Sequence, residues 1–82
     1  MRIDSFLNAA NLVKRRAIAQ DMIAHEAVLL NDKPTKNSHE VKVGDKIELR
    51  YLAKSLRFVV LAVPNTRTVP KSAREVYVKE IQ

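Results

Sequence analysis

The sequence predicts an α+β fold in which two N-terminal helices pack on a small antiparallel sheet. The first third of the chain, from Ile3 to Glu26, lacks Gly and Pro and is rich in helix-forming residues. After Glu26, short apolar runs alternate with clusters of turn residues, a pattern typical of strands. The length of 82 residues allows one hydrophobic core. We therefore expect a single small domain.

Two helices are expected in the first third because two asparagines interrupt the apolar pattern. Asn8 and Asn11 are poor residues for a helix interior but good caps. The first helix is predicted from Asp4 to Ala10 and the second from Lys14 to His25. Arg15 falls on the apolar arc of the second helix, so it fits only if it lies at the helix start.

The strands follow in order. Val28–Leu30 is predicted as a short strand, closed by a turn at Asn31–Pro34. In Lys46–Tyr51 apolar and charged residues alternate with period two, as in a half-buried strand. Leu56–Val63 is a second β-rich run, and the two are expected to pair as a hairpin.

The C-terminal part, residues 64–82, is predicted as a short extension packed on the same domain. Asn65–Pro70 is a polar connector, and Ser72–Glu75 has the spacing of a capping box for one helical turn. Val76–Ile81 is expected to return as an edge strand.

Composition argues against catalysis and for a polyanionic partner. The chain has no Cys, one Gly and two distant His, so neither a thiolate, a Gly-rich loop nor a recognised metal spacing is present, and we expect no cofactor. No signal peptide or membrane-spanning run is evident, and a cytoplasmic location is expected. A net charge of +6 favours nucleic acid, then anionic lipid or acidic proteins, and charge alone does not choose among them.

The densest charged feature is the triplet Lys14-Arg15-Arg16 at the start of the second predicted helix. Cations are disfavoured in a helix's first turn, whereas free N–H groups and the helix dipole there attract phosphate. The triplet thus indicates a phosphate-binding surface. The alternative is a solvated basic face, the usual role of an isolated charge cluster.

An ordered set of short motifs resembles the S-four RNA-binding domain, a family named after a small-subunit ribosomal protein. The motifs are Arg2-Ile3-Asp4, Lys14-Arg15-Arg16-Ala17-x-Ala19, Val28-x-x-Asn31, Lys36-x-Ser38 and Val43-Gly44-Asp45-Lys46-Ile47. The resemblance covers Met1 to about Arg50. Two positions depart from the family: Glu26 and Asp32 stand where it usually has Gly, which questions the local turn geometry.

This resemblance implies the αL-type RNA-binding motif over residues 1–63, gripping structured RNA by its shape and phosphates. The RNA-binding residues carried over by position are Arg2 and Arg16 as best phosphate contacts, Lys14 and Arg15 in support, and Lys33 and Lys36 extending the footprint. Asp4 is expected to orient an arginine or cap a helix, since a carboxylate repels phosphate. Asn31 is interpreted as a turn residue rather than a base reader.

As a short stand-alone chain, the protein resembles the bacterial ribosome-associated quality-control subfamily. The resemblance implies binding to ribosomal RNA of the large subunit and to peptidyl-tRNA, with a nascent-chain tailing factor as a further partner. We expect a monomer, although no sequence feature determines the oligomeric state. Three alternatives stay open: a heat-shock-type large-subunit recycling factor, a basic module for an acidic partner, and an accessory unit of an RNA-modifying enzyme acting in trans.

Overall fold

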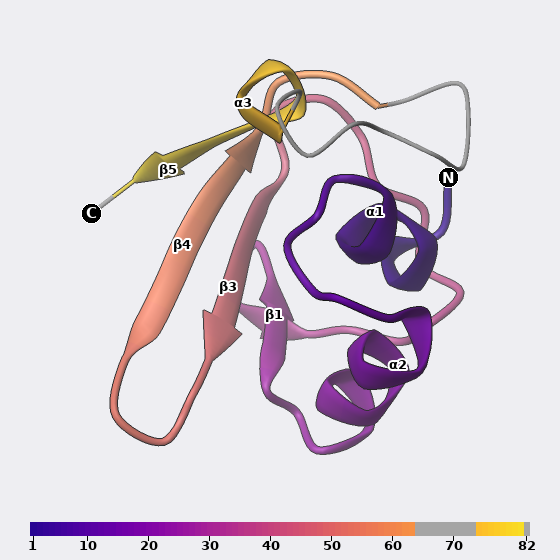
Figure 1. Ribbon diagram of the computed structural model, residues 1–82, viewed down its shortest axis with the longest axis vertical. Coiled ribbons are helices and arrows are strands. Elements are labelled where there is room, and N and C mark those ends of the chain that lie inside the picture. Colours follow the sequence, from indigo (N-terminus) through magenta and orange to yellow (C-terminus); the bar gives the residue numbers. More distant parts are fainter. Residues whose placement is uncertain (64–73, 82) are drawn as a thin grey trace.

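The computed structural model, which describes residues 1–63 and 74–81, contains the predicted helices and strands in the predicted order (Figure 1). It also contains a short strand at Lys33–Pro34, where a turn was predicted, because only Asn31 and Asp32 form the turn and the next two residues pair with the preceding strand. The elements are α1 (Ile3–Ala9), α2 (Arg16–Ala24), β1 (Val28–Leu30), β2 (Lys33–Pro34), β3 (Lys46–Arg50), β4 (Ser55–Val60), α3 (Arg74–Tyr77) and β5 (Val78–Ile81). The predicted α+β class is confirmed. None of the helices in the described residues is long and apolar enough to span a membrane.

The strands form one antiparallel sheet in the order β2-β1-β3-β4-β5. The hairpin predicted between the two long strands is present, with Ile47 opposite Phe58. β5 pairs with β4 at the sheet edge, with Val78 opposite Val60. The edge strand predicted at Val76–Ile81 is present only as Val78–Ile81, because Val76 and Tyr77 belong to α3. The division of the chain at residue 63 stays a prediction.

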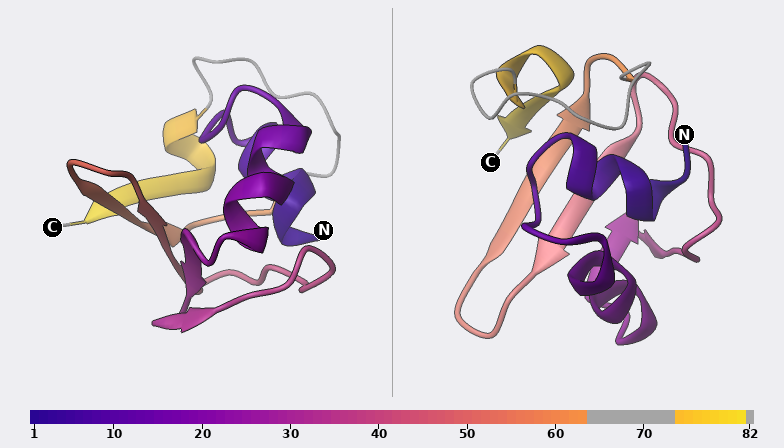
Figure 2. Two further views of the ribbon diagram at one scale, coloured as in Figure 1. Left: turned by 90° about the horizontal axis from the view of Figure 1, so that it is seen from below. Right: turned by 45° about the vertical axis from the view of Figure 1, so that its right-hand side comes forward.

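The core lies between the two helices and one face of the sheet (Figure 2). Successive strand residues point to opposite faces, so Ile47 and Leu49 of β3 share the helix-covered face. The core side chains come from both layers and include Ile3, Phe6 and Leu7 of α1, Ala19 and Ile23 of α2, and Phe58 and Val60 of β4. Glu48, between Ile47 and Leu49, belongs to the opposite face of the sheet.

Some element bounds differ from the predictions. α2 begins at Arg16 rather than Lys14, because Arg15 is extended (φ −138°, ψ 146°) and forms the N-cap. β4 ends at Val60 because its partner strand begins at Val78: the Leu61 N–H still donates to the Tyr77 carbonyl, but Tyr77 belongs to α3, and the Ala62 N–H shares the same carbonyl. The connector predicted at Asn65–Pro70 and the first half of the capping box, residues 72–73, lie outside the described residues.

Both residues that depart from the pattern of the S-four resemblance adopt left-handed backbone conformations. Glu26 has φ 57° and follows α2; its N–H donates to the Ile23 carbonyl, and that of Ala27 to Met22, which is a Schellman ending. Asp32 has φ 69° and, with Asn31 at φ 52°, forms the two-residue turn between β1 and β2. The turn geometry that glycine favours is therefore kept, at a conformational cost, by residues with a Cβ.

Replacing Glu26 by Gly is therefore expected to stabilise the domain by about 1 kcal/mol, because glycine reaches this backbone conformation without steric cost. The free energy of unfolding from urea titration measures the gain. Glu26→Ala is the matched control: it removes the same charge but keeps a Cβ. An equal gain in both variants would attribute the effect to the charge and refute the backbone argument.

Candidate nucleic-acid interface

The centre of the candidate site is the buried carboxylate of Asp4, at the start of α1. Its Oδ2 accepts hydrogen bonds from Arg2 Nη2 (3.3 Å), Arg16 Nε (3.2 Å) and Gln20 Nε2 (3.0 Å). Its Oδ1 accepts one from the Ser5 N–H at 2.8 Å. Asp4 thus joins arginines that precede α1 and open α2, which agrees with the expectation that it orients a neighbouring arginine.

The carboxyl group of Asp4 stays ionised although its side chain is fully buried. Burial alone raises its pKa, but hydrogen bonds from Gln20, the Ser5 N–H and Arg16, with the charge of Arg16, lower the pKa below its ordinary value of 3.8. The negative charge is therefore held inside the fold and compensated by two arginines. It is shielded from a ligand outside, while both arginines remain partly exposed, at 45% and 42% of their side chains.

Arg2 is also held on its other side by the loop before Val41. Its Nε donates to the Asn37 carbonyl at 3.4 Å, and the N–H of Ile3 donates to the His39 carbonyl at 2.8 Å. The N-terminal ammonium of Met1 forms an ion pair with Glu40 at 2.7 Å. These contacts fix the N-terminal residues against this loop and limit the directions in which the Arg2 guanidinium can point.

Lys14 and Arg15 are exposed on the linker that leads into α2. Asn11, in the left-handed region at φ 61°, turns the chain after α1, and the N–H groups of Leu12 and Val13 both donate to Leu7. No side chain in the described part of the chain caps the N-terminus of α2 at Arg15. The linker therefore places two cations beside N–H groups that lack a side-chain cap, an arrangement that favours an anion such as phosphate.

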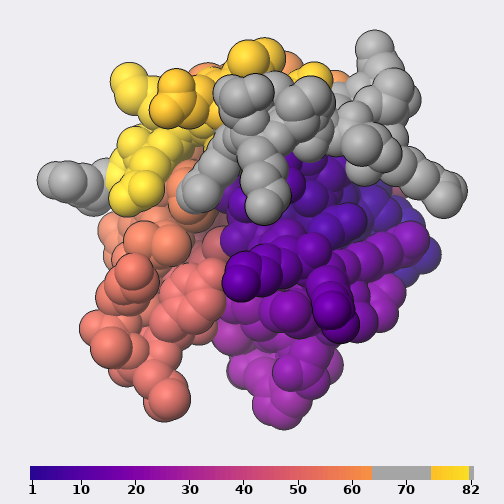
Figure 3. Space-filling model, in the orientation of Figure 1, coloured from indigo at the N-terminus to yellow at the C-terminus, as the bar shows by residue number. Residues whose placement is uncertain are grey.

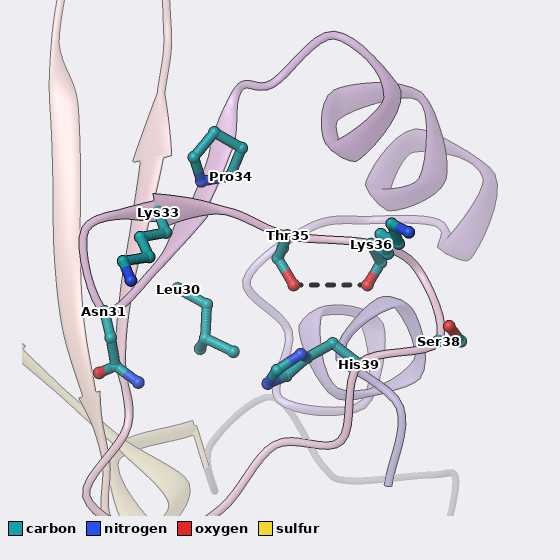
Figure 4. Close-up of a pocket in the computed structure, with 8 residues that line it drawn as sticks. All are labelled: Leu30, Asn31, Lys33, Pro34, Thr35, Lys36, Ser38 and His39. Atoms are coloured by element: carbon teal, nitrogen blue, oxygen red, sulfur yellow. Dashed lines mark hydrogen bonds between the residues drawn. The ribbon is translucent and has the colours of Figure 1, made fainter.

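Lys33 and Lys36 lie on a hollow at the β1–β2 turn and the following loop (Figure 4). Its lining residues are Leu30, Asn31, Lys33, Pro34, Thr35, Lys36, Ser38 and His39. The two lysines stand at opposite ends of the hollow (Figure 4). Lys36 precedes Asn37, whose carbonyl contacts Arg2, so Lys36 adjoins the arginine cluster. Lys33 lies farther along, opposite Leu30.

The structure therefore groups the predicted residues unequally. Arg2 and Arg16 meet at one carboxylate oxygen, Lys14 and Arg15 flank them, Lys36 adjoins Arg2, and Lys33 lies apart. α1, α2 and their linker form one continuous face in the space-filling view (Figure 3). Asn31 lies in the β1–β2 turn, as predicted, and its side chain links this turn to the start of β3 through hydrogen bonds with Asp45 and the Lys46 N–H.

Sequence reasoning missed Gln20 and Asn37 as supports of the site. Gln20 had a detectable signal, because it follows Arg16 by four residues and so shares its helix face. Asn37 contributes its backbone carbonyl, and a backbone contact of this kind cannot be predicted from a pattern of side chains.

Sequence comparisons match the chain to one domain family and to relatives that share one name. Residues 1–47 match the family model of the S4 domain. The chain is 44% identical over 78 residues, 95% of this chain and 93% of the other, to the RQC P-site tRNA stabilizing factor of Helicobacter pylori strain J99. It is 31% identical over 73 residues to the protein of that name from Bacillus subtilis, covering 89% of this chain and 85% of the other.

Two solved structures share the fold over nearly the whole chain. The trimeric structure of heat shock protein 15 from Vibrio cholerae has a TM-score of 0.89 at 25% identity, covering 99% of this chain and 81% of the other. The solution structure of a hypothetical protein, HP1423, has a TM-score of 0.86 at 41% identity, covering 100% and 98%.

Proposed function

Since the chain belongs to the S4 domain family, we propose that it is a non-enzymatic protein that docks on structured RNA of the large ribosomal subunit and on peptidyl-tRNA during quality control of stalled nascent chains. The resemblance noted in the motifs is confirmed by the family model and by relatives named RQC P-site tRNA stabilizing factor. The proposal gives the six basic residues of the candidate site the role of phosphate contacts: Arg2, Lys14, Arg15, Arg16, Lys33 and Lys36.

The observation that carries the proposal is the convergence of Arg2 and Arg16 on the buried Asp4. Arg16 is held through one nitrogen and Arg2 through two, so each guanidinium loses less conformational freedom when its remaining donors bind a phosphate. An arginine on a purely solvated face needs no such buried anchor. The pairing therefore favours a preorganised phosphate site over the alternative of a solvated basic face.

Quality control is favoured over a heat-shock recycling role by sequence. The relatives named for RQC match at up to 44% identity, whereas heat shock protein 15 shares the fold at 25%. The proposal also includes a cytoplasmic location, a monomeric state and cooperation with a factor that extends the stalled chain. An enzymatic partner in trans is no part of it.

The test is sedimentation of the tagged full chain from bacterial lysate through a sucrose gradient at fixed salt. Wild type is expected to travel with large subunits, and hybridisation is expected to detect tRNA in the same fractions. Arg16→Ala and Arg2→Ala are expected to shift most of the protein to the top, because each removes a phosphate contact. Lys54→Ala, at the exposed β3–β4 turn, is the matched control and should sediment like wild type.

Three results contradict the proposal. Wild type at the top of the gradient would remove the ribosomal role. Arg2→Ala and Arg16→Ala sedimenting like wild type would show that association does not use this cluster. If Lys54→Ala left the ribosomal fractions to the same extent as Arg2→Ala and Arg16→Ala, the loss of association would be explained by net charge alone.

A further inference from the structure

The face of the sheet turned away from the helices carries a second group of cations. The alternation that places Ile47, Phe58 and Val78 in the core places their neighbours on this outer face. Lys46 and Arg50 of β3, Arg57 of β4 and Lys79 of β5 belong to it, and all four are exposed. We call these four residues the outer cluster.

A carboxylate anchors two of these cations, Arg50 and Arg57, much as Asp4 anchors Arg2 and Arg16. Glu48 Oε2 accepts from Arg50 Nε at 2.6 Å, and Oε1 accepts from Arg57 Nε at 2.9 Å. The Glu48 side chain is 9% exposed, while those of Arg50 and Arg57 are 57% and 58% exposed. Both guanidiniums are thus fixed through Nε, and among the described residues no hydrogen bond holds their terminal nitrogens, which can face a ligand.

The anchor is itself ionised. The hydrogen bond from Arg50 lowers the pKa of Glu48; burial opposes this, and the charges of Arg50 and Arg57 add to the lowering. The single negative charge of Glu48 therefore faces two guanidiniums, and these three side chains together keep a net positive charge.

Lys46 and Lys79 extend the cluster along the same face. Both lie opposite Val59, on either side of it, so their Cα atoms are two strand spacings apart, about 10 Å. Lys46 and Arg57 also line a hollow of about 220 Å³, together with Asp32, Ile47, Glu48 and Ile81. Asp32 and Glu48 are the acidic residues of this lining, and Glu48 is paired with two arginines.

We propose that the outer cluster is a second binding surface for an RNA backbone, so that one molecule contacts RNA on both sides of its sheet. The inference rests on the proposed function for the nature of the ligand. Guanidiniums held by Nε present paired N–H donors that match phosphate oxygens. In the part of the chain that the structure describes, α1 and α2 cover only the other face of the sheet (Figure 2), so one molecule can present both surfaces together.

The scarcity of exposed apolar residues on this face favours RNA over an acidic protein as the ligand. A stable protein interface has an apolar core from which charged residues are depleted. The strongly exposed large apolar residues of the described chain are Ile18, Val43, Tyr51, Leu52, Leu61 and Val76, and none of them lies in β3, β4 or β5. The apolar residues of β4 and β5 on this face, Val59 and Ile81, are half-buried, so the exposed side chains of the outer cluster are charged, as expected for recognition of a phosphate backbone.

The test uses the full chain with Lys46→Gln and Lys79→Gln combined, leaving the Glu48 pairs intact. Its matched control is Lys42→Gln with Lys54→Gln, which removes the same charge from exposed positions outside both surfaces. Binding of a fluorescein-labelled RNA hairpin is titrated across salt concentrations. The slope of log affinity against log salt is expected to fall by about two for the outer variant and by much less for the control.

A second readout tests the two-sided geometry directly. Donor- and acceptor-labelled copies of the hairpin are mixed with protein below the hairpin concentration. Energy transfer is expected with wild type and the control, and its loss is expected with the outer variant, because one molecule then holds one hairpin. Analytical ultracentrifugation of the protein alone checks that transfer does not arise from self-association.

The outcomes separate the two proposals. Suppose that Arg16→Ala weakens hairpin binding while the outer variant matches its control in slope and energy transfer. The result would then support RNA binding by the candidate site around Arg16 and refute RNA binding by the outer cluster. If neither variant weakens binding, the proposed function itself fails. Unchanged RNA binding together with lost binding of a poly-glutamate peptide would assign the outer face to an acidic protein and overturn the inference.

Discussion

Replacing Asp4 by Ala is expected to destabilise the domain by about 2 kcal/mol and to weaken RNA binding by about tenfold. The substitution removes the acceptor of three side-chain hydrogen bonds, from Arg2, Arg16 and Gln20. Since both arginines are partly exposed, their charges return to water when Asp4 is lost, and the cost stays below that of stranding a buried charge. Affinity falls because the two guanidiniums are no longer held at fixed positions.

The direction of the affinity change makes this prediction diagnostic. Removing a carboxylate raises the net positive charge, which by itself strengthens RNA binding. Asp21→Ala is the matched control, because Asp21 lies on α2 with a side chain 75% exposed and makes the same change in charge. Fluorescence anisotropy with an RNA hairpin, below the unfolding temperature of both variants, measures the difference. Equal or tighter binding by Asp4→Ala than by Asp21→Ala would refute an orienting role for Asp4.

Acidification is expected to lower the melting temperature steeply between about pH 5 and pH 2. Gln20, the Ser5 N–H and Arg16 lower the pKa of Asp4 against the effect of burial, and Arg50 and Arg57 lower that of Glu48. A pKa that is lower in the folded state gives stability that is fully present above the unfolded values of 3.8 and 4.5. That stability is lost as the pH falls through the folded pKa values, because the protonated acids leave their arginine partners unpaired.

Scanning calorimetry from pH 7 to pH 2 measures this dependence. Asp4→Asn and Glu48→Gln are each expected to start from a lower melting temperature and to show a flatter decline, since each variant lacks one titrating group. Asp21→Asn, at an exposed position, is expected to follow the wild-type curve. A wild-type melting temperature that does not change below pH 4.5 would contradict the charge pairing of both carboxylates.

Local patterns in the sequence were sufficient for the element types and for most of their order. The period-two alternation in Lys46–Tyr51 assigns β3 its two faces, because alternation across a strand depends only on backbone geometry. The asparagines after Leu7 predict the break between α1 and α2, and Asn11 does adopt a left-handed turn there. The basic residues at the start of α2 were likewise visible, because helix ends carry a dipole that makes cations there unusual.

Tertiary structure alone decided which charges work together. Arg2 and Arg16 are 14 positions apart, and only the packing of α1 on α2 brings both to the oxygen of Asp4. Lys46 and Lys79 are separated by 33 positions and share a face only through the register of three strands. Such pairings depend on how elements dock and on burial that shields a carboxylate from solvent, and no local pattern encodes either, so the sequence located the cations whereas the fold determined their anchors.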